Sequence, residues 1–195
     1  MSLNPQHLDK KAVFFIIGPS GSGKTTMAKF LAEKLDYDYI EGDDLHPKAN
    51  VEKMGAGHPL NDEDRWGWLY NCGGACALQL DSPNVKGIVM TCSALKKAYR
   101  DVLRESLKHR PGSVHFFYLM ASKEVLVERT KARKNHYMKS DMVDSQLRDM
   151  QTPKDDEKDA YTLNIENSPE VSQKCAYDLV EKIMKDKDED IKHKN

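Results

Sequence analysis

Several features that would place this 195-residue chain in a membrane, a secretory route or a disulfide-bonded fold are missing. Its longest apolar runs fall far short of the roughly 20 residues that span a bilayer. Residues 1–11 resemble neither a signal peptide nor a transit peptide. Cys72, Cys76, Cys92 and Cys175 form no C-x-x-C pair, which disfavours a zinc site and favours reduced, buried thiols. We therefore expect a cytoplasmic protein with no membrane partner.

An excess of either charge is also missing, since Lys and Arg total 30 against 31 for Asp and Glu. A nucleic-acid partner is not expected, because such proteins present a basic face to the phosphates. The length fits one domain, which we place at residues 1–185. Ser168 and Pro169 predict the start of a last helix that ends near Met184. Residues 186–195 form a charged tail that we expect to fray in solvent.

The most informative stretch that is present is a glycine-rich loop between an apolar β-rich run and a helical pattern. It reads G-x-x-x-x-G-K-T and consists of Gly18, Pro19, Ser20, Gly21, Ser22, Gly23, Lys24 and Thr25, with Thr26 following. Glycines let the backbone amides point inward at phosphates, and the helix N-terminus adds partial positive charge. A ligand-free turn is the alternative, but the pattern is expected by chance in roughly one such chain in a hundred. We predict a bound triphosphate, with Lys24 on its phosphates and the Thr25 hydroxyl on magnesium.

Five apolar runs alternate with helical stretches, at residues 12–17, 37–41, 87–92, 114–120 and 160–165. This alternation predicts a three-layer α/β/α fold around a mostly parallel five-stranded sheet. Ligands of such sheets bind beyond the carboxyl ends of the strands. Two inserted segments are expected: a substrate-binding one at about 44–86, with a helix starting near Asn61, and a lid at about 131–141.

Acidic residues follow the second run. Asp43 could accept the proton of an attacking hydroxyl or hold that hydroxyl in line with the γ-phosphate. Either Glu41 or Asp43 could also hold a magnesium-bound water. The alternative is an acidic turn that caps the next helix, which fits Asp44 well. His46 could contact substrate or only pack before Pro47.

Cations are spread over the chain downstream. Lys53 and Arg65 would each be a solvated charge if taken singly, but together with Asp43 they could bind an anionic substrate. The third run is followed by Ser93 and by Lys96 and Arg100, which share a helical face. No acid follows this run, so magnesium would depend on Thr25, water and the acids of the second run.

A basic segment follows the fourth run and its helix. Arg129 and Arg133 are four residues apart, and guanidinium groups can stack on adenine or grip phosphate. A basic helix end would also be favoured by the helix dipole alone. In a chain with a phosphate loop, we favour a lid that neutralises the transferring phosphoryl group.

At this point the residues resemble the gluconokinases, in the small phosphate-loop kinase group that includes shikimate and adenylate kinases. The resemblance covers most of the chain and rests on the phosphate loop, on Gly42-Asp43 with Leu45-His46-Pro47, on Pro59-Leu60-Asn61-Asp62 with Asp64-Arg65, on Cys92-Ser93-Ala94-Leu95-Lys96 with Tyr99-Arg100-Asp101, and on Lys131-Ala132-Arg133-Lys134 leading to His136. The lid block departs from the family pattern in having Asn135 where glycine is usual.

The resemblance implies transfer of a phosphoryl group from Mg-ATP to the 6-hydroxyl of D-gluconate. The product, 6-phosphogluconate, would feed the pentose phosphate pathway, and a homodimer is implied as a possibility. We take Lys24, Asp43 and Arg133 as the catalytic residues. By analogy with the shikimate kinases, the resemblance implies that Asp43 engages the acceptor hydroxyl and Arg65 the carboxylate end of the substrate. The acid would be held by Asp43, His46, Lys53, Arg65, Ser93, Lys96, Arg100 and His136. Two alternatives stay open: a kinase of the same fold acting on another small hydroxy acid, and a nucleotide-binding module without turnover.

Overall fold

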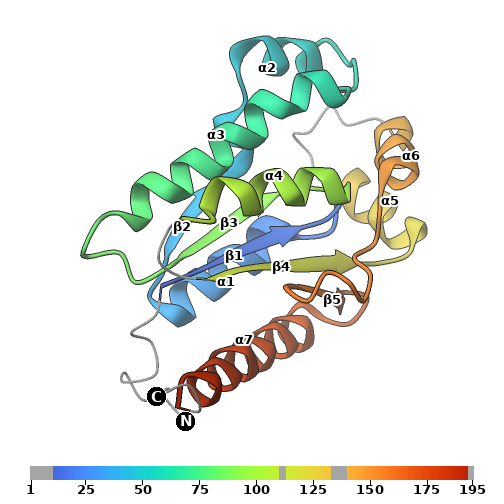
Figure 1. The fold of residues 1–195 in the computed structure, drawn as a ribbon. Helices are drawn as coiled ribbons and strands as arrows, with labels where there is room; N and C mark the ends of the chain where they lie inside the picture. The colour runs from blue at the N-terminus through green and yellow to red at the C-terminus, as the bar shows by residue number, and fades with distance from the viewer. Residues whose placement is uncertain (1–10, 110–112, 133–139, 193–195) are drawn as a thin grey trace.

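The chain folds around a five-stranded sheet in which each neighbouring pair of strands is parallel (Figure 1). The computed structural model describes residues 11–109, 113–132 and 140–192. The strand order is β2-β3-β1-β4-β5. The strands are β1 (Ala12–Ile17), β2 (Asp38–Glu41), β3 (Ile88–Cys92), β4 (Ser113–Met120) and β5 (Ala160–Asn164). The predicted fold class and the five predicted runs are confirmed.

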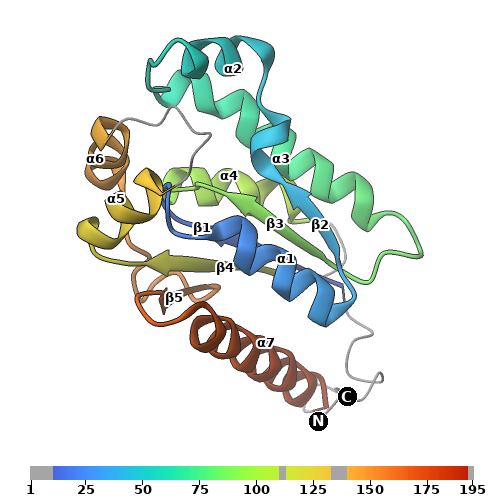
Figure 2. The same cartoon turned by 180° about the vertical axis from the view of Figure 1, so that it is seen from behind.

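Helices cover both faces of this sheet (Figures 1 and 2). Successive residues of β1 point to opposite faces, so Phe14 and Ile16 pack with α1 (Lys24–Leu35) and α7 (Pro169–Lys192). Phe15 and its alternate neighbours pack instead with α3 (Asp62–Leu80) and α4 (Lys97–Leu107). Every residue of β1 is buried, which explains why its sequence is continuously apolar rather than alternating.

The second strand does not lie directly beside the first. β3 separates them and pairs with both, with Glu41 opposite Thr91 and Ile17 opposite Cys92. The carboxyl ends of β1, β2 and β3 therefore meet at one edge of the sheet. At this edge β1 runs into the phosphate loop and β2 into a short 3-10 turn, Gly42–Leu45.

The segment between β2 and β3 contains α2 (Lys48–Gly55) and α3. α3 starts where the acidic cluster predicts, with Asn61 as N-cap in a capping box with Asp64. Gly73 in the middle of α3 has a packing reason, because a Cβ there would lie 2.4 Å from the Ser106 Cβ of α4. The glycine thus lets the two helices approach closely.

The carboxyl ends of the strands are also flanked by α5 (Lys123–Lys131) and α6 (Ser140–Asp149) (Figure 1). Residues 133–139 lie outside the described residues, and with them Arg133 and His136 of the predicted lid. α7 starts at Pro169, as predicted, with the Ser168 hydroxyl accepting a hydrogen bond from Val171 N–H at 3.4 Å.

The predicted helix end near Met184 is wrong, because α7 continues to Lys192. No proline or glycine interrupts residues 185–192, so no helix-breaking residue ends the helix at Met184. A charge run was therefore misread as an end of structure.

Three of the four cysteines have the environment that the composition predicts. Cys72, Cys76 and Cys92 are buried free thiols, and burial raises the pKa of Cys76. Cys175 is exposed, so the expectation of a buried thiol is wrong there. Among the described residues, no helix combines the length and the apolar character needed to cross a membrane.

Candidate active site

The loop after β1 has a backbone that only glycines adopt easily. Gly18, Gly21 and Gly23 have φ angles of 143°, 82° and 81°. A Cβ at Gly21 would also lie 2.6 Å from the Leu126 carbonyl oxygen of α5, whereas a Cβ at Gly23 would meet nothing within 4 Å. The loop is thus packed on one side and open at the N-terminus of α1, where phosphates bind in loops of this type.

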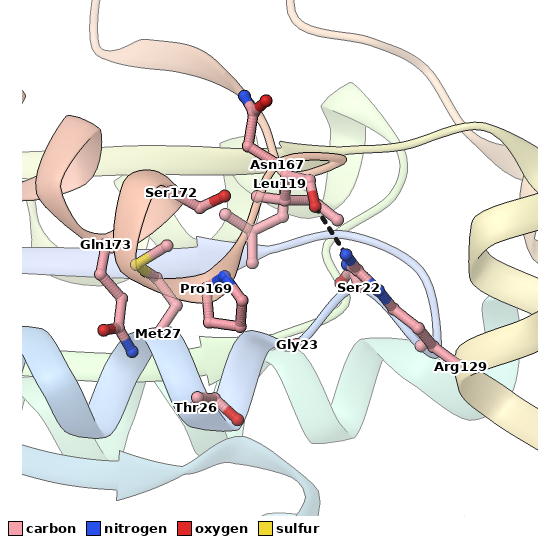
Figure 3. A pocket seen from close by; sticks show the side chains of 12 residues that line it. Ser22, Gly23, Thr26, Met27, Leu119, Arg129, Asn167, Pro169, Ser172 and Gln173 are labelled. Carbon is pink, nitrogen blue, oxygen red and sulfur yellow. Dashed lines mark hydrogen bonds between the residues drawn. The ribbon is translucent and has the colours of Figure 1, made fainter. Parts of the chain in front are cut away.

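A first cavity of about 270 Å³ lies on one side of the loop (Figure 3). It is lined by Gly21, Ser22, Gly23, Thr26, Met27, Leu119, Arg129, Ile165, Asn167, Pro169, Ser172 and Gln173. The structure therefore brings five predicted nucleotide-binding residues together here. The Arg129 guanidinium, from the last turn of α5, donates to the Ile165 carbonyl oxygen at 2.9 Å, the dashed line in Figure 3.

One wall of this cavity, formed by residues between Asn167 and Gln173, was not predicted from the sequence. Asn167 comes from the link between β5 and α7, and Pro169, Ser172 and Gln173 come from the first turns of α7. The signal was available, because this link follows the carboxyl end of a strand of a parallel sheet. The carboxyl-end rule predicts ligand contacts there as it does after β1 and β2.

A second, smaller cavity of about 70 Å³ lies on the other side of the loop. It is lined by Ser20, Lys24, Asp43, His46, Met54, Pro59, Leu60, Arg65, Trp68, Ser93, Ser145 and Gln146. Lys24 and Ser20 of the loop thus share one cavity with four of the predicted acid-binding residues. Pro59 and Leu60 of its apolar wall belong to the blocks that carry the family resemblance, whereas Ser145 and Gln146 of α6 carried no signal in the sequence.

Asp43 and His46 form one wall of the second cavity. The Asp43 side chain is 73% exposed, and the His46 side chain is 5% exposed, with 4.0 Å between Asp43 Oδ1 and His46 Nε2. The imidazole stacks on Trp68 with 4.2 Å between ring centroids. Burial lowers the pKa of His46; the negative charge of Asp43 opposes that shift and the positive charge of Arg65 adds to it. His46 therefore both packs against Trp68 and lines the second cavity.

Arg65 reaches the second cavity from the first turn of α3. Its side chain is only 11% exposed and lies 3.7 Å from Asp149 of α6. One guanidinium nitrogen also donates to the Tyr99 hydroxyl at 3.3 Å. A guanidinium held in this way on the wall of a small cavity is suited to binding a carboxylate.

Lys53 and Lys96 lie outside the lining of this cavity, because each pairs with an acid of α3. Lys53 contacts Asp64 at 2.5 Å, and Lys96 contacts Asp62 at 2.7 Å. Each pair holds the pKa of its carboxyl below the ordinary range, mainly through the hydrogen bond from the lysine.

Arg100, predicted to contact substrate, lies inside the protein and outside the lining of both cavities. Its side chain is 1% exposed, pairs with Glu157 and donates to the carbonyl oxygens of Ala94 and Leu95. The shared face predicted for Lys96 and Arg100 is not formed, because Lys96 is the N-cap of α4 and points to Asp62. Arg100 supports the turn after β3 from inside the protein.

Thr25 contacts the acid at the end of β2. The Glu41 carboxylate accepts hydrogen bonds from the hydroxyls of Thr25 at 3.0 Å and Tyr39 at 2.5 Å, and from that of Thr91. Burial alone would raise the pKa of Glu41, but these hydrogen bonds and the charge of Lys24 outweigh burial and lower it. An ionised carboxylate therefore lies beside the loop although no acid follows β3.

Fold and site together define a class of protein. The family model described as an AAA domain matches residues 13–153. A phosphate loop between a base-sized cavity and a smaller, cation-lined cavity is the arrangement of a phosphate-loop kinase.

Comparison with known proteins gives the particular family. The chain is 60% identical to a Schizosaccharomyces pombe protein named "Probable gluconokinase", over 93% of this chain and 94% of that one. It is 40% identical to the thermoresistant gluconokinase of Escherichia coli, over 79% and 85% of the two chains. The crystal structure of a gluconokinase from Sinorhizobium meliloti 1021 superposes with a TM-score of 0.78 at 34% identity, covering 92% of this chain and 95% of that one. The chain belongs to the gluconokinase family.

Proposed function

We propose that this chain is a gluconokinase, which transfers the terminal phosphoryl group of ATP to the 6-hydroxyl of D-gluconate. The observation that carries the proposal is the pair of cavities on either side of the phosphate loop. The family membership selects gluconate among the small acids that the second cavity could hold. A nucleotide-binding module without turnover would need only the first cavity.

The first cavity fits the nucleoside of ATP. Met27, Leu119 and Ile165 provide apolar contact for a base, and the guanidinium of Arg129, which also lines this cavity, is of the kind that can stack on it. The open loop and the N-terminus of α1 then face the phosphates. Lys24 lines the second cavity and would contact the end of the phosphate chain that is nearest to the acid.

The oxygen donors beside the loop fit magnesium, which prefers oxygen ligands. Thr25 would hold the ion directly, and the ionised Glu41 carboxylate would hold one of its waters. When bound, the ion neutralises charge on the phosphates. Glu41, at the end of β2, would thereby take the place of an aspartate after β3.

The second cavity fits the acid. Arg65 would bind the carboxylate end of gluconate, and Ser93 and His46 would meet its hydroxyl groups. Asp43 would accept the proton of the attacking hydroxyl or hold it in line with the phosphoryl group, with Lys24 stabilising the transferred charge. Arg133 and His136 stay predictions for the lid, as do a homodimer and a cytoplasmic location.

An ADP-release assay with a panel of acids tests the proposal. Gluconate, shikimate and glycerate are each supplied with Mg-ATP, and an ATP-only reaction gives the background. We expect the rate of ADP release to rise well above that background with gluconate and with no other acid of the panel. A rate with another acid but not with gluconate would establish a different acid kinase of the same fold. The absence of a rate with any acid would favour the binding module.

A further inference from the structure

One contact of the second cavity joins α6 directly to the phosphate loop. The Gln146 side-chain oxygen Oε1 accepts a hydrogen bond from the backbone N–H of Ser20 at 2.7 Å, across 126 residues of sequence. Both residues line the second cavity, as does Ser145. Backbone N–H groups of such loops are the groups that bind phosphate oxygens. The carboxamide of Gln146 therefore uses a donor that a nucleotide would also use.

The position of Ser20 indicates which phosphate is concerned. Gly21, Ser22 and Gly23 line the first cavity, whereas Ser20 and Lys24 line the second. A triphosphate whose base lies in the first cavity runs along the loop toward the second. Its terminal phosphoryl group then lies nearest to Ser20 N–H, and ADP ends before this point.

The backbone of α6 is held from several sides, while the Gln146 side chain is only half-buried. Val143 is buried, and Asp144 pairs with Lys123 of α5 at 2.8 Å. Asp149 lies 3.7 Å from Arg65, which lines the second cavity. A rotation of the Gln146 side chain can thus exchange its partner without a displacement of the helix.

We propose that the Gln146 carboxamide and the terminal phosphoryl group of the nucleotide compete for the Ser20 N–H, so that binding of a triphosphate turns Gln146 toward the hydroxyl groups of the acceptor. A hydrogen bond from the same N–H to an anionic phosphoryl oxygen is about twice as strong as one to a neutral oxygen, so the triphosphate wins. Gln146 is then a positioning residue that links the two cavities. Its role toward the acceptor rests on the proposed function, whereas its competition with the nucleotide does not.

Binding titrations of Gln146 variants test the competition. Gln146→Glu keeps the length of the side chain but places a carboxylate where the terminal phosphoryl group arrives. We expect it to weaken binding of a non-hydrolysable ATP analogue about tenfold or more while changing ADP binding less than about twofold, by calorimetry. Arg148→Ala, an exposed change on the same helix outside the cavity lining, is the control and leaves both affinities unchanged.

Steady-state kinetics of Gln146→Ala test the acceptor side. Loss of one or two hydrogen bonds to the acid is expected to raise its KM by about tenfold, with kcat kept within about threefold. A structural role alone would instead lower the melting temperature and leave KM unchanged. A wild-type protein inactive on gluconate would contradict the proposed function and leave the nucleotide titrations as the test of Gln146.

Equal effects of Gln146→Glu on ADP and on the analogue, or no effect on either, would overturn the competition. If the variants do not fold, NMR spectra of the ¹⁵N-labelled wild-type protein test the competition instead. The Gln146 side-chain amide signals should shift with the analogue and stay in place with ADP. The same shift with both nucleotides would contradict the proposal.

Discussion

Two carboxylates at the end of β2 have different surroundings although they are two residues apart. Glu41 is held by three hydroxyl groups and has a lowered pKa, whereas the Asp43 side chain is 73% exposed in the second cavity. Fixed hydrogen bonds suit Glu41 to hold a water of magnesium. Free space around Asp43 suits it to meet a substrate hydroxyl. These different surroundings are the basis for the two roles proposed above for Glu41 and Asp43.

Asp43→Asn tests the second of these roles. The amide keeps the shape of the side chain but cannot accept a proton, so kcat should fall by a factor of about 10²–10⁴ with ATP affinity nearly unchanged. Steady-state kinetics and a nucleotide titration measure the two quantities. Asp44→Asn, an adjacent exposed carboxylate outside the cavity lining, is the matched control. An unaltered kcat in Asp43→Asn would remove this residue from the chemistry.

Arg65→Ala tests the binding of the acid. Removal of the guanidinium from the second cavity should raise KM for gluconate by about tenfold or more, with little change in KM for ATP. Initial rates at varied gluconate and varied ATP give both constants. A melting curve is needed beside them, because Arg65 also contacts Tyr99 and Asp149. A rise in KM confined to ATP would place Arg65 outside the acid site.

α3, which carries two residues of the second cavity, approaches α4 closely at its middle. α3 brings Arg65 and Trp68 to the cavity and runs beside α4 (Figure 1). Gly73 of α3 meets Ser106 of α4. The neighbouring Gly74 is exposed, and a Cβ there would meet nothing within 4 Å. Of these two adjacent glycines, Gly73 is therefore required by helix packing, whereas Gly74 is not.

Alanine substitutions at the two positions test this difference through their effects on stability. Gly73→Ala forces α3 and α4 apart and should lower the free energy of unfolding by about 1–3 kcal/mol. Gly74→Ala adds helix propensity at an open position and should raise it by up to about 1 kcal/mol. Urea unfolding of both variants beside the wild type measures the difference. A stabilising effect of both substitutions would show that the two helices can move apart freely.

Across the whole fold, a buried ion pair joins elements that are distant in the chain. Glu157 precedes β5 and pairs with Arg100 inside α4, while Arg104 contacts the same carboxylate at 2.8 Å. The carboxyl group is desolvated, but the two guanidinium groups lower its pKa from the ordinary 4.5 to about 2. Arg100 in turn holds the carbonyl groups of Ala94 and Leu95, next to Ser93 of the second cavity.

Glu157→Gln should therefore lower the free energy of unfolding by about 3 kcal/mol at neutral pH, because it leaves Arg100 without a charged partner inside the protein. The pKa of Glu157 is depressed in the folded state, so its contribution is complete above about pH 4.5 and is lost as the pH falls toward 2. The difference between variant and wild type should shrink over that window. Urea unfolding at several pH values measures it.

Asp178→Asn, which breaks an exposed pair with Lys174 on α7, is the control for this prediction. It should be close to neutral at every pH, because solvent screens such a pair. A Glu157→Gln effect that stays constant down to pH 2 would mean that packing rather than charge carries the contribution.

Errors in the sequence reasoning arose where one local pattern fits several tertiary environments. The spacing of Lys96 and Arg100 suggested a shared binding face, but it contained no information on the facing partners, Asp62 and Glu157. The charge run after Met184 fits a solvated helix as well as a frayed tail. Gln146 had no motif of its own and is identified only by its contact with Ser20.

Local signals in the chain were enough to identify the phosphate loop, the five strands and the start of α3, because each depends on neighbours within a few residues. The family followed from several such short blocks in their order along the chain. The placement of β3 between β1 and β2, which brings Glu41 beside Thr25, could not be read from them. The same holds for the burial of Arg100 and for the Ser20–Gln146 contact across 126 residues. Such contacts depend on how the helix layers pack on the sheet, and that packing is a property of the assembled fold rather than of any one segment.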